Sequence, residues 1–222
     1  MFPYLDPTIV LLIPAVLFSL WAQFKVKGAF SRYSEVRASS GVTADQVSRE
    51  LLDRFGLGNV RVERIQGHLT DHYDPRSKVL RLSDAVAGNS SIAAIGVAAH
   101  EVGHAIQDKE GYAFLRFRNS IVPAVNIGST MSMPLFFIGL IMGSAPLLNI
   151  GILLFCGVLV FHLVTLPVEF DASARALKLL SETGLLKGSE VGGAKAVLDA
   201  AALTYVAALV MTVLQLIRLL AL

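Results

Sequence analysis

Residues 89–108 read NSSIAAIGVAAHEVGHAIQD, and this stretch decides how the rest of the chain is interpreted. Ser90 or Ser91 can cap the N-terminus of a helix, and the apolar residues that follow can continue that helix through the segment HEVGH at positions 100–104. Side chains four positions apart on a helix project from one face, with their β-carbons about 5–6 Å apart. His100 and His104 can therefore reach the same ion.

The segment HEVGH fits the pattern H-E-x-x-H, in which two histidines bind zinc and the glutamate accepts a proton from metal-bound water. A chance match has no reason to fall in an alanine-rich, otherwise uncharged helix. There, two histidines and a glutamate are costly to bury without a partner such as a metal ion. The sequence therefore predicts one zinc ion, with His100 and His104 as ligands and Glu101 as general base.

The composition predicts a membrane protein. Of the 222 residues, 54% are hydrophobic and only 16% are charged, and the mean hydropathy is +0.62. A membrane helix needs roughly 20 mostly apolar residues. Residues 119–168 contain no Asp, Glu, Lys or Arg, and a Gly-Ser-Ala-Pro cluster at 143–146 divides them in two. Four spans are predicted, near residues 5–24, 121–142, 147–167 and 200–220.

The charges around these spans predict their orientation. The apolar run of the first span, residues 8–24, is preceded by Asp6 without any Lys or Arg and is followed by Lys25 and Lys27, which is the reverse of a cleavable signal peptide. Every Lys and Arg except Arg218 falls within 25–118 or 175–195. By the positive-inside rule both segments are cytoplasmic, and the two termini face outward. The predicted location is the inner membrane of a prokaryotic cell, with the active site on the cytoplasmic side.

Charge and cysteine content exclude other classes of protein and site. The formal net charge is +2 and the sequence has no dense basic run, so nucleic acid is not an expected partner. The expected partners are the lipid bilayer and a protein or peptide substrate. Cys156 is single and lies in an apolar span, which excludes an intrachain disulfide or a zinc site built from several cysteines.

The segment before the motif helix predicts a small α+β subdomain. A helix is expected from Thr43 to Phe55, because its apolar residues recur at helical spacing. Residues 59–66 and 78–83 alternate as strands do, with a turn at 73–77 between them. This subdomain can offer a strand edge to an extended peptide substrate. It can equally serve only to cover the motif helix, and both interpretations stay open.

A catalytic zinc ion needs a third protein ligand and one open position. In the three-histidine pattern H-E-x-x-H-x-x-G-x-x-H the third histidine falls at position 110, where this chain has Glu110, so that class is excluded. The segment TLPVEFDASARA at 165–176 contains the remaining candidate, Glu169, at the cytoplasmic end of the third predicted span. Carboxylates at this position can also simply mark where the span ends.

Other residues are candidates for supporting positions. Asp171 can orient a ligand histidine through the free nitrogen of its ring. His162 lies seven residues before Glu169 on the same helix face and can line a polar path to the site, although an interior histidine bonded to a neighbouring helix is the simpler interpretation. Arg175, Tyr205 and Tyr73 are candidates to stabilise the oxyanion of the transition state.

Three segments, GVAAHEVGHAIQ, LPVEFDASARAL and YDPRSKVLRLS, resemble the YugP-like family of membrane neutral zinc metallopeptidases. The resemblance covers about residues 40–200. The family is similar to the gluzincin peptidases, in which a glutamate on a second helix completes the zinc site. The resemblance implies His100, His104 and Glu169 as zinc ligands and Glu101 as base. Gluzincins commonly have E-x-x-x-D, but the fourth residue after Glu169 is Ser173, so either Asp171 or Ser173 would orient the histidine.

The predicted fold class is mainly α, a four-helix transmembrane protein with a small cytoplasmic α+β zincin-like subdomain that carries the HExxH helix. The predicted divisions are a first membrane helix, the cytoplasmic subdomain, a two-helix membrane hairpin, a cytoplasmic helical segment with the third ligand, and a last membrane helix (1–24, 25–118, 119–168, 169–199 and 200–222). The predicted function is zinc-dependent hydrolysis of peptide bonds, by a metalloendopeptidase, at the cytoplasmic membrane face. A non-catalytic membrane scaffold or chaperone-like protein with a structural zinc site is the alternative.

Overall fold

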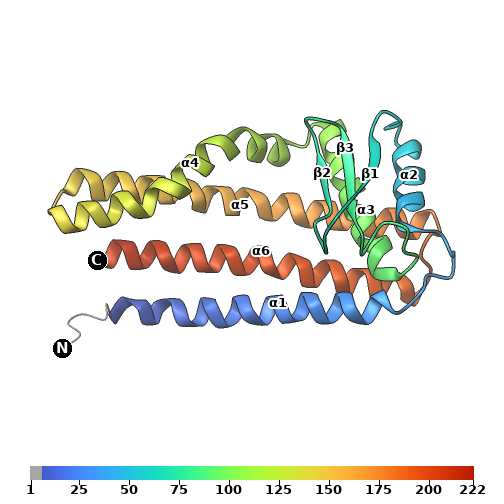
Figure 1. Ribbon diagram of the computed structural model, residues 1–222, viewed down its shortest axis with the longest axis horizontal. Coiled ribbons are helices and arrows are strands. Elements are labelled where there is room, and N and C mark those ends of the chain that lie inside the picture. Colours follow the sequence, from blue (N-terminus) through green and yellow to red (C-terminus); the bar gives the residue numbers. More distant parts are fainter. Residues whose placement is uncertain (1–6) are drawn as a thin grey trace. The chain divides into compact units, whose positions relative to one another are not determined.

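The computed structural model describes residues 7–222, so Asp6 and the first residues of the first predicted span lie outside it. The chain is mainly helical with one small sheet, which confirms the predicted fold class (Figure 1). The elements in chain order are η1 (Pro7–Leu12), α1 (Ile13–Ser34), α2 (Ala44–Arg54), β1 (Arg61–Ile65), β2 (His72–Asp74), β3 (Val79–Ser83), α3 (Ile92–Glu110), α4 (Ala113–Met142), α5 (Ala145–Glu182) and α6 (Ser189–Ala221).

Within residues 7–222, four helical segments are long and apolar enough to cross a membrane, in agreement with the predicted number of spans. They are Thr8–Ser34, Ala113–Met142, Ala145–Glu182 and Ser189–Ala221. All are longer than the predicted spans, because a helix can continue beyond the apolar stretch that marks its membrane-crossing part. In α5 the helix continues through Pro167, so Glu169 lies on the same helix as the third predicted span.

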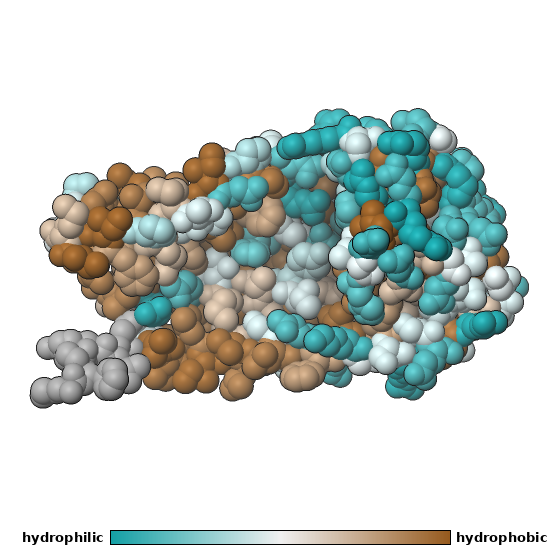
Figure 2. Space-filling model, in the orientation of Figure 1, coloured by the Kyte–Doolittle hydropathy of each residue, from teal (hydrophilic) through white to brown (hydrophobic). Residues whose placement is uncertain are grey.

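The chain divides into two compact units. Of the described residues, the membrane unit comprises 7–23, Ala113–Pro167 and Leu203–Leu222, and the polar unit comprises Phe24–Tyr112 and Val168–Ala202. Hydrophobic residues predominate on the visible face of the α4–α5 hairpin, whereas hydrophilic residues predominate over α2 and the strands (Figure 2). The two units thus differ in surface chemistry.

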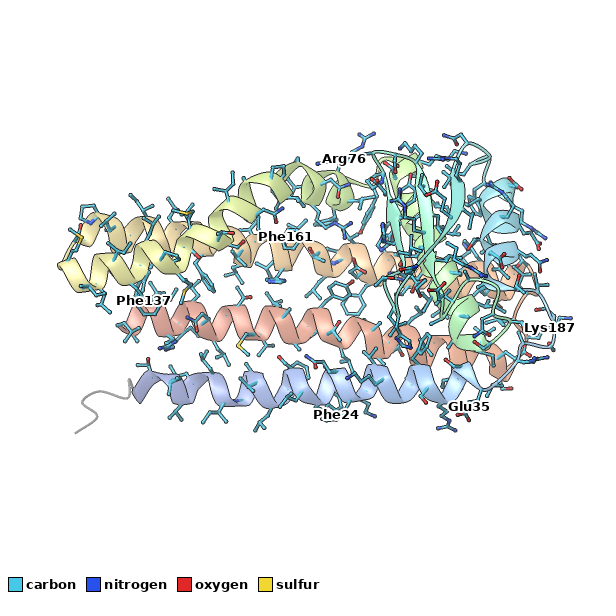
Figure 3. All side chains as sticks on the ribbon, in the orientation of Figure 1. Phe24, Glu35, Arg76, Phe137, Phe161 and Lys187 are labelled. Atoms are coloured by element: carbon cyan, nitrogen blue, oxygen red, sulfur yellow. The ribbon has the colours of Figure 1, made fainter. Side chains whose placement is uncertain are left out.

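Glycines allow close packing within the membrane unit. A Cβ at Gly139 on α4 would lie 2.6 Å from the backbone nitrogen of Leu148 on α5, and one at Gly151 would lie 2.8 Å from that of Phe136. Such contacts let two helix backbones approach each other in a bilayer, where no hydrophobic effect drives helices together. Large apolar side chains such as Phe137 face outward from this hairpin at 42% exposure (Figure 3).

The sheet of the polar unit has the strand order β1-β3-β2. β1 pairs with β3 in parallel and β2 pairs with β3 in antiparallel orientation, so β2 is an edge strand. β2 occupies residues that the sequence pattern had assigned partly to a turn. The turn proper is shorter, and the Asp74 side chain closes it by accepting hydrogen bonds from the Arg76 backbone nitrogen and the Ser77 hydroxyl.

Helix α3 lies at the centre of the polar unit's core. Ser91 is its N-cap, as one of the two predicted alternatives, and the Ser91 hydroxyl accepts a hydrogen bond from the Ala94 backbone nitrogen at 3.3 Å. Most residues of α3 are buried, and they share one core cluster with α2, β3 and the parts of α5 and α6 in this unit. A Cβ at Gly103 would lie 2.6 Å from the Ala172 carbonyl oxygen. This glycine therefore lets α3 approach α5 closely, within the motif itself.

Candidate metal centre

Three predicted ligands from two helices converge in the polar unit. His100 and His104 on α3 and Glu169 on α5 each offer one ligand atom, and these atoms all lie within 4.8 Å of one another. The Glu169 Oε2 atom lies 3.2 Å from His100 Nε2 and 3.6 Å from His104 Nε2. The two imidazole rings are one helical turn apart and nearly perpendicular, with centroids 4.7 Å apart. Both rings thus present Nε2 to the same carboxylate oxygen.

The centre is buried and polar. Glu169 is 4% exposed and His104 is 8% exposed. Burial by itself lowers the pKa of His104, but the close Glu169 carboxylate and the negative charge of Glu101 raise that pKa above its ordinary value. A buried carboxylate needs a positively charged partner. Two imidazole nitrogens and one carboxylate oxygen are the protein donor set of catalytic zinc sites, which leave a fourth position for water. The residues therefore fit a zinc ion.

Glu101 lies beside the ligand group and binds the edge strand. Its Oε2 atom accepts a hydrogen bond of 2.9 Å from the backbone nitrogen of Tyr73 on β2. The Tyr73 hydroxyl in turn donates to Asp108 Oδ2 on α3 at 2.7 Å. Burial and the contact with Asp108 raise the pKa of the Tyr73 phenol, so the hydroxyl stays protonated as the donor. Two hydrogen bonds thus hold Tyr73 of β2 against the motif helix.

Both ligand histidines have a second polar contact at Nδ1. The Ser173 hydroxyl oxygen lies 3.1 Å from His100 Nδ1, and Gln107 Oε1 lies 2.9 Å from His104 Nδ1. Of the two predicted candidates, Ser173 therefore contacts a ligand histidine directly. Asp171 instead accepts hydrogen bonds from Gln107 and from Arg175.

Gln107 was not among the site residues predicted from the sequence. It lies three positions after His104 on α3, so helical spacing places the two side chains on one face. That spacing was the available signal, but it does not distinguish Gln107 from other polar residues near the motif.

The remaining candidates have other neighbours. Arg175 donates to Asp171 and to Glu110, each at 2.6 Å, and Tyr73 is held by Asp108.

His162 lies in the membrane unit. Its ring contacts that of Phe161, which is labelled in Figure 3, and it lines a pocket of about 320 Å³. Polar residues of this pocket include Ser19, Gln23, Thr204 and Thr212. The predicted role of His162 beside the zinc ligands stays a prediction.

Comparison with known proteins identifies the class to which this fold and site belong. Residues 8–222 match the family described as "Putative neutral zinc metallopeptidase", and the chain belongs to that family. The chain is 49% identical over 210 residues to "Putative membrane protease YugP" of Bacillus subtilis (strain 168), covering 95% of this chain and 93% of that protein. Both findings confirm the resemblance stated from the three sequence segments. No solved structure matches the chain.

Proposed function

We propose that the chain is a membrane-embedded zinc metalloendopeptidase that hydrolyses peptide bonds of protein or peptide substrates at the cytoplasmic membrane face. The observation that supports this most strongly is the convergence of His100, His104 and Glu169 around one point, with Glu101 on the same helix. Membership of a zinc metallopeptidase family supports the same reaction class.

His100, His104 and Glu169 would hold the zinc ion, which when bound would supply a Lewis acid and lower the pKa of its bound water toward about 7. Glu101 accepts the proton of the attacking water and delivers it to the leaving amine. Tyr73 steadies the Glu101 carboxylate through its backbone nitrogen and leaves the second oxygen of that carboxylate for the proton. Ser173 and Gln107 hold the outer nitrogens of the two histidines.

The edge strand β2 is proposed to bind the substrate. β2 pairs with β3 along one edge, and the backbone nitrogen of Tyr73 points to Glu101 rather than to β3. The other edge of β2 therefore faces the motif helix. An extended peptide that lies along this edge, beside the Tyr73 nitrogen that stays bonded to Glu101, would bring its scissile carbonyl next to Glu101.

The cytoplasmic orientation rests on the distribution of Lys and Arg, which concentrate in the polar segments between the candidate spans. With four spans, both termini lie outside the cytoplasm. A reporter protein fused after Leu222 tests this orientation, because reporter activity in the cytoplasm would contradict it.

Metal removal tests the reaction itself. The purified full-length protein in detergent is expected to hydrolyse an unfolded protein substrate, to lose that activity when a chelator removes zinc, and to regain it when one equivalent of zinc per chain is restored. Cleavage is followed by the appearance of new amino termini. Stoichiometric zinc without cleavage of any of a panel of unfolded proteins would instead support the structural-zinc scaffold.

A further inference from the structure

Four side chains form a hydrogen-bonded series that ends at a ligand histidine. Arg175 Nε donates to Asp171 Oδ2 at 2.6 Å, and Gln107 Nε2 donates to the same oxygen at 2.8 Å. Gln107 Nε2 also donates to the Val168 carbonyl oxygen at 2.8 Å, and its Oε1 faces His104 Nδ1 at 2.9 Å. Gln107 is fully buried at 0% exposure, so these protein groups are its partners instead of solvent.

The partners of Gln107 determine which way its amide points. The Val168 carbonyl oxygen can only accept a hydrogen bond, and so can the Asp171 carboxylate, which forms an ion pair with Arg175. The amide nitrogen must face these two acceptors, because the reverse orientation would set the amide oxygen against both of them. The amide oxygen therefore faces His104, and the atom opposite an acceptor must carry a proton. His104 Nε2 also faces an acceptor, Glu169 Oε2, but at 3.6 Å, whereas Gln107 Oε1 lies 2.9 Å from Nδ1. A neutral His104 has one ring proton, and the shorter contact places it on Nδ1.

We infer that Gln107 is a positioning residue that holds His104 in the Nδ1-protonated tautomer, so that the lone pair of Nε2 points to the metal centre. This inference rests on the proposed function, because it concerns how one zinc ligand is prepared for the ion. Nε2 is the ring atom that faces Glu169, at 3.6 Å from its Oε2. The hydrogen bond at one ring nitrogen fixes the state of the other, which is how partners of metal-binding histidines act.

The tautomer of the other ligand histidine, His100, is less constrained by its partner. The Ser173 hydroxyl that contacts His100 Nδ1 can rotate and can donate or accept, so it does not select one tautomer. His100 and Ser173 are both partly exposed, which allows water to replace the hydroxyl. Water cannot replace the Gln107 amide in this way, because Gln107 is fully buried. His104 therefore depends more strongly on Gln107 than His100 depends on Ser173.

The first experiment compares Gln107→Leu with Ser173→Ala in the full-length protein. We expect Gln107→Leu to weaken zinc binding by about 10- to 100-fold, the range typical of lost outer-sphere partners, and Ser173→Ala to weaken it several-fold less. Zinc affinity is measured by competition with a chromophoric chelator. Histidine ¹⁵N NMR of the zinc-free protein, at a pH where the ring is neutral, should show Nδ1–H for His104 in the wild type and loss of that preference in Gln107→Leu.

A second variant keeps the inference testable if Gln107→Leu fails to fold. Gln107→Met keeps the unbranched shape of the glutamine side chain but lacks its amide, so it cannot accept the hydrogen bond from His104 Nδ1. It should weaken zinc binding and lose the Nδ1–H preference in the same way as Gln107→Leu. Wild-type zinc affinity and tautomer in folded Gln107→Met would overturn the inference.

The outcomes separate this inference from the proposed function. If the wild type binds zinc tightly and Gln107→Leu is folded with unchanged affinity and tautomer, the role of Gln107 is wrong and the zinc site stands. If the wild type itself binds no zinc, the proposed function fails. The His104 tautomer then reports only whether His104 Nδ1 donates to Gln107.

Discussion

Replacing Glu101 with glutamine is expected to lower the rate of peptide hydrolysis by about 100- to 10,000-fold, the usual contribution of a general acid–base group, while zinc content stays at the wild-type level. The amide cannot accept the proton of the attacking water. It can still accept the hydrogen bond from the Tyr73 backbone nitrogen, so the local geometry should survive. Initial rates on an unfolded protein substrate, with zinc measured in the same samples, check both expectations.

Glu182→Gln is the matched control for this variant. It makes the same chemical change at an exposed carboxylate on α5, whose partner is Lys178 at 3.9 Å. The control is expected to retain wild-type activity and zinc content. Wild-type activity in Glu101→Gln would contradict the mechanism, and loss of zinc from it would mean that Glu101 contributes to metal binding.

Replacing Glu169 with alanine is expected to weaken zinc binding by at least about 100-fold, beyond the roughly 10- to 100-fold typical of an outer-sphere partner. The Glu169 carboxylate oxygen is the atom that both histidine Nε2 atoms approach, and it supplies the negative charge of the donor set. Without it, two neutral imidazoles remain. Zinc affinity by chelator competition gives the measurement, with Glu182→Ala on the same helix as control.

A fully occupied zinc site in Glu169→Ala would remove Glu169 from the ligand set. The mechanism would then need another third ligand. Thermal unfolding of the zinc-free variant separates loss of a ligand from loss of the fold, because a folded variant with weak zinc binding isolates the metal contact.

Local patterns made several features predictable from the sequence. Four apolar stretches were enough for the four candidate membrane helices, because a bilayer requires a long uncharged run. The proximity of His100 and His104 follows from helical spacing alone. The approach of Glu169 to this pair was expected because Glu169 directly follows the uncharged stretch 119–168, at its cytoplasmic end and on the same predicted side of the membrane as the motif helix.

Features that depend on distant parts of the chain were not predictable. β2 has three residues, too few to display the alternation that identifies a strand. The orientation of the Gln107 amide is set by its hydrogen bonds to Val168 and Asp171, which lie 61 and 64 positions further along the chain. Asp171 was expected beside a histidine, but the intervening Gln107 reaches His104 instead. The choice between Asp171 and Ser173 as a direct histidine partner depended on which way α5 turns its side chains toward α3.

The most direct test of the central claim is zinc K-edge X-ray absorption on the full-length protein loaded with one equivalent of zinc. We predict a first shell of nitrogen and oxygen at about 2.0–2.1 Å, with the outer-shell scattering of two imidazoles. The same measurement on Glu169→Ala should show a changed first shell. A wild-type spectrum with fewer than two imidazoles, or with sulfur at about 2.3 Å, would contradict a centre built from His100, His104 and Glu169.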